Sequence, residues 1–178
     1  MTDVTTIIEN DHREVERLFA AYAAATTGDA KTQIIEQVRL ALAPHAAAEE
    51  ILVYPALRGV GGDGNEQANH AIDEHQDIKR LLSEVDKMSA DDADRDAKVR
   101  ELEQAVAHHV EEEEGEFLPS LRAGMSADRL EKMGELFSNM KPLLPTHPHP
   151  LVPGTATAQL LAGPLASVAD RIRDFVSR

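Results

Sequence analysis

The sequence predicts an all-α protein, an antiparallel up-down four-helix bundle with a short fifth helix and a proline-rich C-terminal arm plus helix. Residues with high helix propensity dominate the 178-residue chain, and the period-two alternation typical of strands is almost absent. Four long helical segments are separated by short connections, which make consecutive helices antiparallel neighbours. We therefore expect residues 1–140 to form the bundle and residues 141–178 to form the arm and a closing helix.

Two helical segments predict the first hairpin. The first runs from about Val4, behind Asp3 as its N-cap, to a turn at 26–29. The second covers about 30–58 and contains Pro44, which removes one backbone hydrogen bond and should bend the helix there.

The second hairpin follows the glycine-rich loop GVGGDGN. Its helices are predicted at about 67–87 and from behind Ser89 to just before Gly124. Ser126 then caps a shorter helix that ends near Met140.

The chain changes character at Lys141. The run KPLLPTHPHPLVPG is rich in proline and is expected to be a non-helical arm. His147 and His149 either fold over a site or belong to a linker, and we favour the linker. Beyond the arm, apolar residues at helical spacing predict a short amphipathic helix that docks on another surface: Leu165, Val168, Ile172 and Phe175.

The composition excludes several classes of function. Because the chain has no cysteine, it cannot form a disulfide, a thiolate zinc site or an iron–sulfur cluster. A net charge of -14 opposes binding to nucleic acid and to anionic membrane surfaces. The N-terminus lacks the basic region of a secretory signal, and no apolar run is long enough to span a membrane. We expect a cytoplasmic protein with no nucleic-acid or membrane partner.

An internal repeat relates the two hairpins. The segment HAAAEEILVYP from His45 aligns with HVEEEEGEFLP from His109, and each has a carboxylate four residues after the histidine. Upstream, NDHREVERLF around His12 aligns with DEHQDIKRLL around His75. The two histidines of each hairpin are separated by nearly the same number of residues, so each hairpin carries the same ordered set.

Helical geometry places these residues on inward faces. At about 100° per residue, all four histidines share a face with apolar residues of their own helix. Each HxxxE motif stacks imidazole and carboxylate one turn apart, His45 with Glu49 and His109 with Glu113. A buried glutamate without a cation costs several kcal/mol or becomes protonated, so these side chains require an explanation.

Two interpretations compete for this set. The histidines could be buried and hydrogen-bonded while the glutamates reach water, but a duplicated set with matched spacing favours a metal centre instead. Sulfur-free imidazole and carboxylate donors suit iron, manganese or zinc. Four imidazoles and two carboxylates match two ions better than one, because each carboxylate can bridge.

On these motifs the chain resembles the hemerythrin-like, or HHE cation-binding, domains. The matching segments are DH at 11–12, HAAAEE at 45–50, EH at 74–75 and HVEEEE at 109–114, and the resemblance covers about residues 3–123. It implies two iron ions with an oxo or hydroxo bridge and open positions for a small ligand, with manganese or zinc less favoured. It also implies six metal ligands, two histidines for each iron and two bridging glutamates: His12 and His45, His75 and His109, and Glu49 and Glu113.

The sequence departs from the oxygen-carrying members of the family. Ala71 stands where the carriers have a further histidine, and His70 is about 140° around the helix from His75. The carriers also have a differently spaced carboxylate on the last helix, whereas both motifs here are HxxxE. These departures resemble the enzymes and sensors of the family more than its carriers.

Three further residues are candidates for an additional ligand or a supporting role. Tyr54 replaces Leu118 of the other repeat, and it is either a rim residue with a solvated hydroxyl or a phenolate ligand or hydrogen-bond donor. Glu116 takes the inward position of Leu52 and could move protons, and His70 is the third candidate. No catalytic residue is assigned beyond the metal ligands. The remaining polar neighbours are expected to face water: His108, Glu111, Glu112 and Glu114.

The favoured function is an enzyme, a diiron protein that decomposes hydrogen peroxide in a catalase-like defence against oxidative stress. The alternative is a protein that binds or senses oxygen, nitric oxide or iron without turnover. A ferritin-like iron store is disfavoured, since the order of ligands differs from paired ExxH motifs. The sequence identifies no protein partner.

Overall fold

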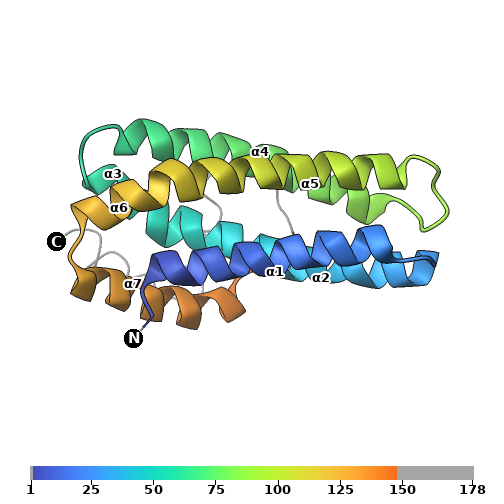
Figure 1. The fold of residues 1–178 in the computed structure, drawn as a ribbon, viewed down its shortest axis with the longest axis horizontal. Helices are drawn as coiled ribbons and strands as arrows, with labels where there is room; N and C mark the ends of the chain where they lie inside the picture. Colours follow the sequence, from blue (N-terminus) through green and yellow to red (C-terminus); the bar gives the residue numbers. More distant parts are fainter. Residues whose placement is uncertain (1, 148–178) are drawn as a thin grey trace.

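The computed structural model describes residues 2–147, and within this range the chain forms helices and turns. The predicted all-α four-helix bundle is confirmed, with long helices that run up, down, up and down (Figure 1). These helices are α1 (Val4–Ala24), α2 (Gly28–Ala48), α4 (Gly64–Lys87) and α5 (Arg95–Glu112). The predicted C-terminal helix and His149 lie outside the described residues. Among the described helices, none combines the length and the apolar character needed to cross a bilayer.

The helix starts follow local side-chain chemistry. Asp3 caps α1 as predicted, because its Oδ1 accepts from the backbone N–H groups of Thr5 and Thr6 at 2.9 and 3.1 Å. In contrast, α5 begins at Arg95, later than expected. The preceding acidic residues form turns, and the Asp92 carboxylate accepts from the Asp94 N–H, a local bond that competes with helix formation.

Both hairpins contain a π-helical segment directly after the α-helix. The segments are η1 (Glu49–Val53) and η2 (Glu113–Phe117), and they lead into α3 (Tyr54–Gly59) and α6 (Leu118–Gly124). In each, the first residue after the segment donates its N–H to the carbonyl five residues back, Tyr54 to Glu49 and Leu118 to Glu113.

A proline explains the position of both π segments. Pro55 and Pro119 are the second residues after the two segments, and a proline has no N–H for the usual bond to the carbonyl four residues earlier. By comparison, α2 continues through Pro44, and the change in helical register comes at Glu49 instead. The wider π turn moves all later residues back around the helix axis by up to about 100°.

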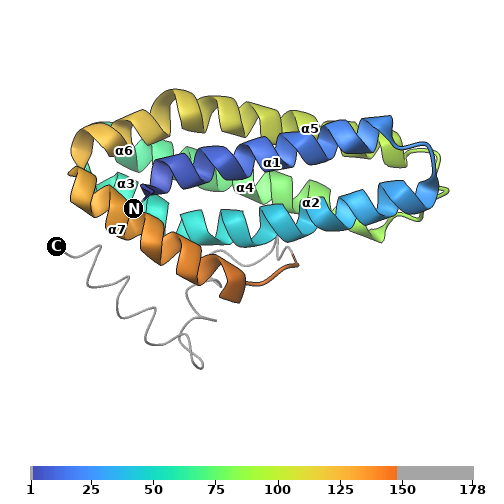
Figure 2. The same cartoon turned by 60° about the horizontal axis from the view of Figure 1, so that its bottom comes forward.

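The loop between the hairpins and the fifth helix complete the described chain. Gly61 and Gly62 adopt φ of 83° and 57°, which only glycine reaches at little cost. The predicted fifth helix is α7 (Ala127–Met140), which crosses the N-terminal end of α1 and the end of α2 (Figure 2). It packs closely, because a Cβ on Gly134 would lie 2.4 Å from the Thr2 carbonyl oxygen.

The arm begins differently from the expectation. Its first residues form a 3-10 turn, η3 (Lys141–Leu143), where a non-helical run was predicted. Proline is tolerated there because Pro142 occupies the first turn, in which an N–H has no helical partner. Leu144 is then buried, and Arg39 donates to the Thr146 carbonyl at 2.7 Å, which holds the arm against α2.

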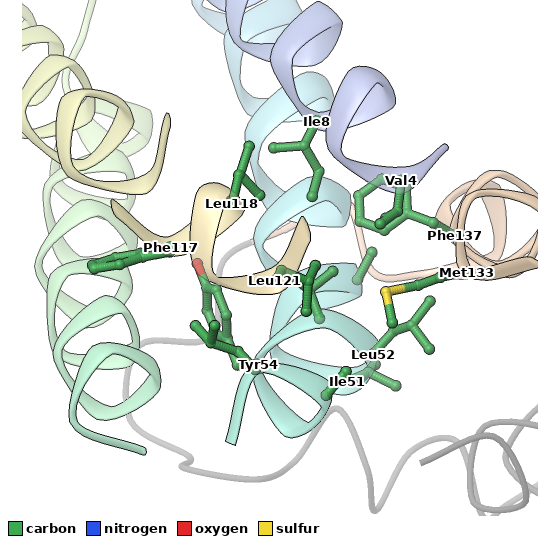
Figure 3. Packing of buried hydrophobic residues seen from close by; sticks show 14 of the residues in the cluster. Val4, Ile8, Ile51, Leu52, Tyr54, Phe117, Leu118, Leu121, Met133 and Phe137 are labelled. Carbon is green, nitrogen blue, oxygen red and sulfur yellow. The ribbon is translucent and has the colours of Figure 1, made fainter. Parts of the chain in front are cut away.

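Two apolar clusters fill the bundle, one on each side of the four histidines. The first lies where α1 begins and includes α3, α6 and α7, with Leu52, Leu118 and Met133 among its members (Figure 3). The second lies toward the opposite end, around residues such as Phe19 and Leu102. Along α1, α2 and α4, the repeated histidine falls between the residues of the two clusters, and on α5 His109 lies at the end of the second cluster, next to Val110. The polar site is thus enclosed by apolar packing at both ends.

Candidate metal centre

The structure brings the six predicted ligands together in the middle of the bundle. Each of the four long helices contributes one histidine, and the glutamates come from the first residues of η1 and η2. Both carboxylates are fully buried, and the histidines are at most 4% exposed. The six residues are His12, His45, Glu49, His75, His109 and Glu113.

Each glutamate lies between histidines of the two hairpins. The carboxylate oxygens of Glu49 are 3.0 Å from His45 Nε2 and 3.5 Å from His75 Nε2. Those of Glu113 lie 3.3 and 3.5 Å from the Nε2 atoms of His12 and His109. Both carboxylates therefore hold the position of a bridge between two groups of ligands.

The inward-facing atoms have few partners among the protein side chains. Both oxygens of Glu49 and Glu113 and the Nε2 atoms of His12 and His45 are buried without a hydrogen bond. Buried polar atoms are costly when unpaired, and carboxylates most of all. Cations in the middle would satisfy these atoms, so the residues fit a metal centre. The donor atoms form two groups that share Glu49: His12, His45, Glu49 and Glu113, and Glu49, His75 and His109.

In each of the four central histidines, Nδ1 faces away from the middle of the bundle and is hydrogen-bonded to a carboxylate. An imidazole that donates its Nδ1–H to a carboxylate presents its Nε2 lone pair to the opposite side, as metal-binding histidines commonly do. The Nδ1–oxygen distances are 2.8 Å for His12 to Glu114, 3.1 Å for His45 to Asp11, 3.1 Å for His75 to Glu50 and 2.8 Å for His109 to Glu74.

The four orienting carboxylates follow one rule in both hairpins. The acid just before the first histidine, Asp11 or Glu74, holds the second histidine of its own hairpin. The acid just after the bridging glutamate, Glu50 or Glu114, holds the first histidine of the other hairpin. The expectation that Glu114 faces water is wrong, because its side chain is only 29% exposed and binds His12. The repeat carried the signal for all four, since they occupy matching positions.

Burial and neighbouring charges shift the pKa values of the central groups. Burial alone would lower the pKa of His45, but the Glu49 charge and the Asp11 hydrogen bond outweigh it and raise the pKa to about 9. For His109, the close contact with the Glu113 carboxylate and the hydrogen bond to Glu74 overcome burial and raise the pKa to about 10. The raised pKa values favour the protonated forms of these two imidazoles, and their positive charges offset the negative charge of the buried carboxylates.

Two other central pKa values move in the opposite direction. Burial lowers the pKa of His75, and the neighbouring His109, whose Nε2 lies 3.1 Å from that of His75, lowers it further. Burial would raise the pKa of Glu113, but the close contacts with the imidazoles of His109 and His12 lower it well below its usual value. The centre is therefore arranged to keep carboxylate negative charge inside the bundle.

Tyr54 belongs to the centre. It is fully buried, and its hydroxyl lies 3.0 Å from His75 Nε2, so the rim interpretation with a solvated hydroxyl is wrong. An ideal helix would turn Tyr54 away from the ligand face, and η1 turns it back. Figure 3 shows its hydroxyl oxygen near the labelled Phe117.

The other additional candidates lie outside the centre. Glu116 is exposed, and Phe117 is buried in its place, because η2 shifts the register by one position. His70 is 52% exposed and pairs with Glu112 at 2.8 Å. His147 is exposed and lies away from the six ligands, 3.9 Å from Asp86.

A small cavity adjoins the histidines on the side opposite Tyr54. Its volume is about 20 Å³, and besides the histidines its walls are mainly apolar, with Leu42, Ile78 and Val106 among them. That volume suits a ligand of one or two heavy atoms.

The fold and the site define a helical bundle with a cation site built from facing helices. The chain belongs to the hemerythrin HHE cation binding domain family, whose model matches residues 3–121. The predicted family is confirmed.

The chain is similar to several individual proteins. An uncharacterized hemerythrin-like protein of Schizosaccharomyces pombe is 30% identical over 179 residues, covering the whole chain and 88% of that protein. A DNA nickase of a Nostoc species is 28% identical over 139 residues, which span 78% of this chain and 39% of the nickase. A crystal structure of a hemerythrin HHE cation binding domain-containing protein from Mycobacterium kansasii superposes with a TM-score of 0.72 at 17% identity. It covers 96% of this chain and 99% of its own, which supports the fold.

Proposed function

We propose that the centre binds two iron ions and that the protein decomposes hydrogen peroxide to water and dioxygen. The observation that carries this proposal is the set of buried, unpaired carboxylate and imidazole atoms beside a small apolar cavity. His12 and His45 would hold one iron, and His75 and His109 the other. Glu49 and Glu113 would bridge, since each lies between histidines of both hairpins. When bound, such an iron pair supplies two-electron redox chemistry at one place.

The surrounding residues restrict what can react. The orienting carboxylates hold the four imidazoles with Nε2 inward, so the donor positions are set before a ligand arrives. The small, mainly apolar cavity leaves room for a small ligand such as peroxide, in contrast to an organic substrate. Burial, together with the charges of Glu113 and Glu49, raises the pKa of Tyr54, which favours a neutral phenol. Tyr54 then holds a proton beside the centre.

The alternative is binding or sensing of oxygen, nitric oxide or iron without turnover. Both hypotheses use the same ligands and the same cavity. A binding protein would show a reversible spectral change with its ligand and would form no product. The name of the Nostoc relative is not carried over to this chain, because a net charge of -14 opposes contact with a phosphate backbone.

The test is oxygen evolution from the iron-loaded protein after addition of peroxide. We expect many turnovers per chain, together with about two irons per chain by elemental analysis. His109→Ala and Glu113→Ala should each remove at least one of the two irons and abolish turnover, because each removes a central donor. Glu116→Gln is the matched control, since it changes an exposed acid three residues from Glu113 and should leave turnover unchanged.

Each result separates the alternatives. Two irons with a reversible response to oxygen or nitric oxide and no evolution would replace the enzyme with the binding protein. Evolution that survives Glu113→Ala would assign the activity to another source. Manganese or zinc in place of iron in protein purified from its natural source would overturn the choice of metal.

A further inference from the structure

A second group of histidines and carboxylates lies on the outer surface of the second hairpin. His70 of α4 faces His108 and Glu112 of α5, and Glu74 lies beneath them. His70 Nε2 is 2.8 Å from a Glu112 oxygen and 4.0 Å from Glu74 Oε1. His108 Nε2 is 3.5 Å from the other Glu112 oxygen and 3.7 Å from the same Glu74 atom. Two imidazoles and two carboxylates thus converge from neighbouring helices.

The other three orienting carboxylates of the centre each carry a cationic side chain on the outside. Lys141 pairs with Asp11, Lys79 with Glu50 and Arg13 with Glu114. These cations stabilise carboxylates that must remain charged while they hold an imidazole.

At the fourth carboxylate, Glu74, the corresponding outer place is taken by His70 and His108. One oxygen of Glu74 binds His109, but the other, Oε1, is buried without a hydrogen bond and faces the two histidines. By the pattern of the other three carboxylates, a positive charge belongs at this position.

We propose that His70, His108, Glu112 and Oε1 of Glu74 form a surface site for a divalent first-row transition-metal ion. Neutral imidazole and carboxylate donors at these separations are the set that zinc and ferrous iron accept. The donor atoms of His70, Glu74 and Glu112 all lie within 4.8 Å of one another. The histidine side chains are 52% and 63% exposed, so the site is open to ions from solution.

The site would be coupled to the buried centre through one carboxylate. Glu74 would bind the outer ion through Oε1 and His109 through Oε2. An ion there withdraws charge from Glu74, so it weakens the hold of Glu74 on the proton of His109 Nδ1. The proposal itself does not depend on which metal fills the centre, because it uses none of the six central ligands.

The test is equilibrium dialysis of the purified full-length protein, as isolated, against zinc, with zinc and iron measured in the same samples. We expect the wild-type chain to take up about one zinc more than the double variant His70→Asn/His108→Asn, without loss of iron. Glu112→Gln should lower zinc affinity in the same direction. His147→Asn is the control, because this exposed histidine is outside the cluster.

Nuclear magnetic resonance signals of individual histidines distinguish binding at this site from binding scattered over the surface. Zinc should shift the imidazole signals of His70 and His108 together and leave that of His147 in place. Equal zinc uptake by the wild type and the double variant would overturn the proposal, as would equal losses in the double variant and His147→Asn. Both surface histidines are exposed, so their substitution is not expected to affect folding.

Discussion

The two hairpins provide equivalent ligands to the centre but place them in different surroundings. Both supply two histidines, a buried central glutamate and two orienting carboxylates at matching positions. In the part of the centre around His75 and His109, the hydroxyl of Tyr54 contacts His75. The residue of the second hairpin that matches Tyr54 is the apolar Leu118. The half with His45 lies against the ring of Phe137 from α7, with ring centroids 6.0 Å apart. An internally repeated ligand set thus becomes chemically asymmetric through its neighbours.

The difference extends to the outside of the bundle. On the first hairpin, α7 and η3 cover the surface, and Lys141 of η3 pairs with Asp11. On the second, the equivalent carboxylate, Glu74, lies under exposed histidines. The repeat therefore determines which atoms can hold metal, and the elements outside it determine access and charge.

The largest expected effect tests the symmetry of the bridging carboxylates. Glu49→Ala and Glu113→Ala should each remove at least one of the two proposed irons, and to the same extent, because each glutamate contacts both hairpins. Elemental analysis of the purified variants measures this, with Glu111→Ala as an exposed control. Full iron content in one variant alone would show that the two carboxylates are not equivalent.

The next largest effect tests the packing of α7 against the first hairpin. Phe137→Ala should lower the free energy of unfolding by about 3–5 kcal/mol, because Phe137 is fully buried and its removal leaves a cavity. Denaturant unfolding measures the change. Leu143→Ala in the same region should change it by less than about 0.5 kcal/mol, because Leu143 is 54% exposed. Similar values for both variants would mean that α7 does not hold the first half in place.

A smaller effect tests the orienting carboxylates across the two halves. Glu74→Gln and Asp11→Asn should each weaken metal binding by about 10–100-fold, since the amide no longer fixes the charge and orientation of the imidazole. Competition with a chelator measures the affinity. Glu103→Gln, an exposed change on α5, should leave it unchanged. If Asp11→Asn left the metal affinity unchanged while Glu74→Gln lowered it, the orienting role would be confined to Glu74 in the second hairpin.

The smallest effect on stability tests the tyrosine that distinguishes the halves. Tyr54→Phe should cost only about 1 kcal/mol, because the ring stays in the core and one hydrogen bond is lost. If Tyr54 reaches the iron, the same change should remove a visible absorption band while the iron content stays constant. Leu118→Met is the volume-conserving control in the other hairpin and should leave the spectrum unaltered. An unchanged spectrum in Tyr54→Phe would restrict Tyr54 to hydrogen bonding.

Much of the site could be predicted from the sequence because its signals are local or repeated. Histidine and glutamate four residues apart lie one above the other on any α-helix, so the pairs in both HxxxE motifs needed no tertiary information. The Asp3 cap and the fifth helix depend on neighbouring residues in the same way. The inward direction of the histidines followed from the apolar residues that share their faces.

The errors came at the π segments. Strict helical angles placed Tyr54 off the ligand face and Glu116 on it, and the structure has the reverse. Pro55 and Pro119 were visible in the sequence, but a proline is compatible with a bend, a helix end or a wider turn. The choice depends on which carbonyl the neighbouring N–H groups reach once the helices are packed.

The sequence by itself determined the helical bundle and the duplicated set of histidines and glutamates, because these follow from periodicity and spacing along single helices. The order of the same motifs was enough to predict the family. The tertiary structure decided what surrounds the ligands. The hydrogen bonds that His75 donates to Glu50 and His12 donates to Glu114 cross between hairpins, so their existence depends on how the two hairpins dock. The same docking brings His70 and His108 together over Glu74. Distances between helices are set by core packing, which no spacing along one helix encodes.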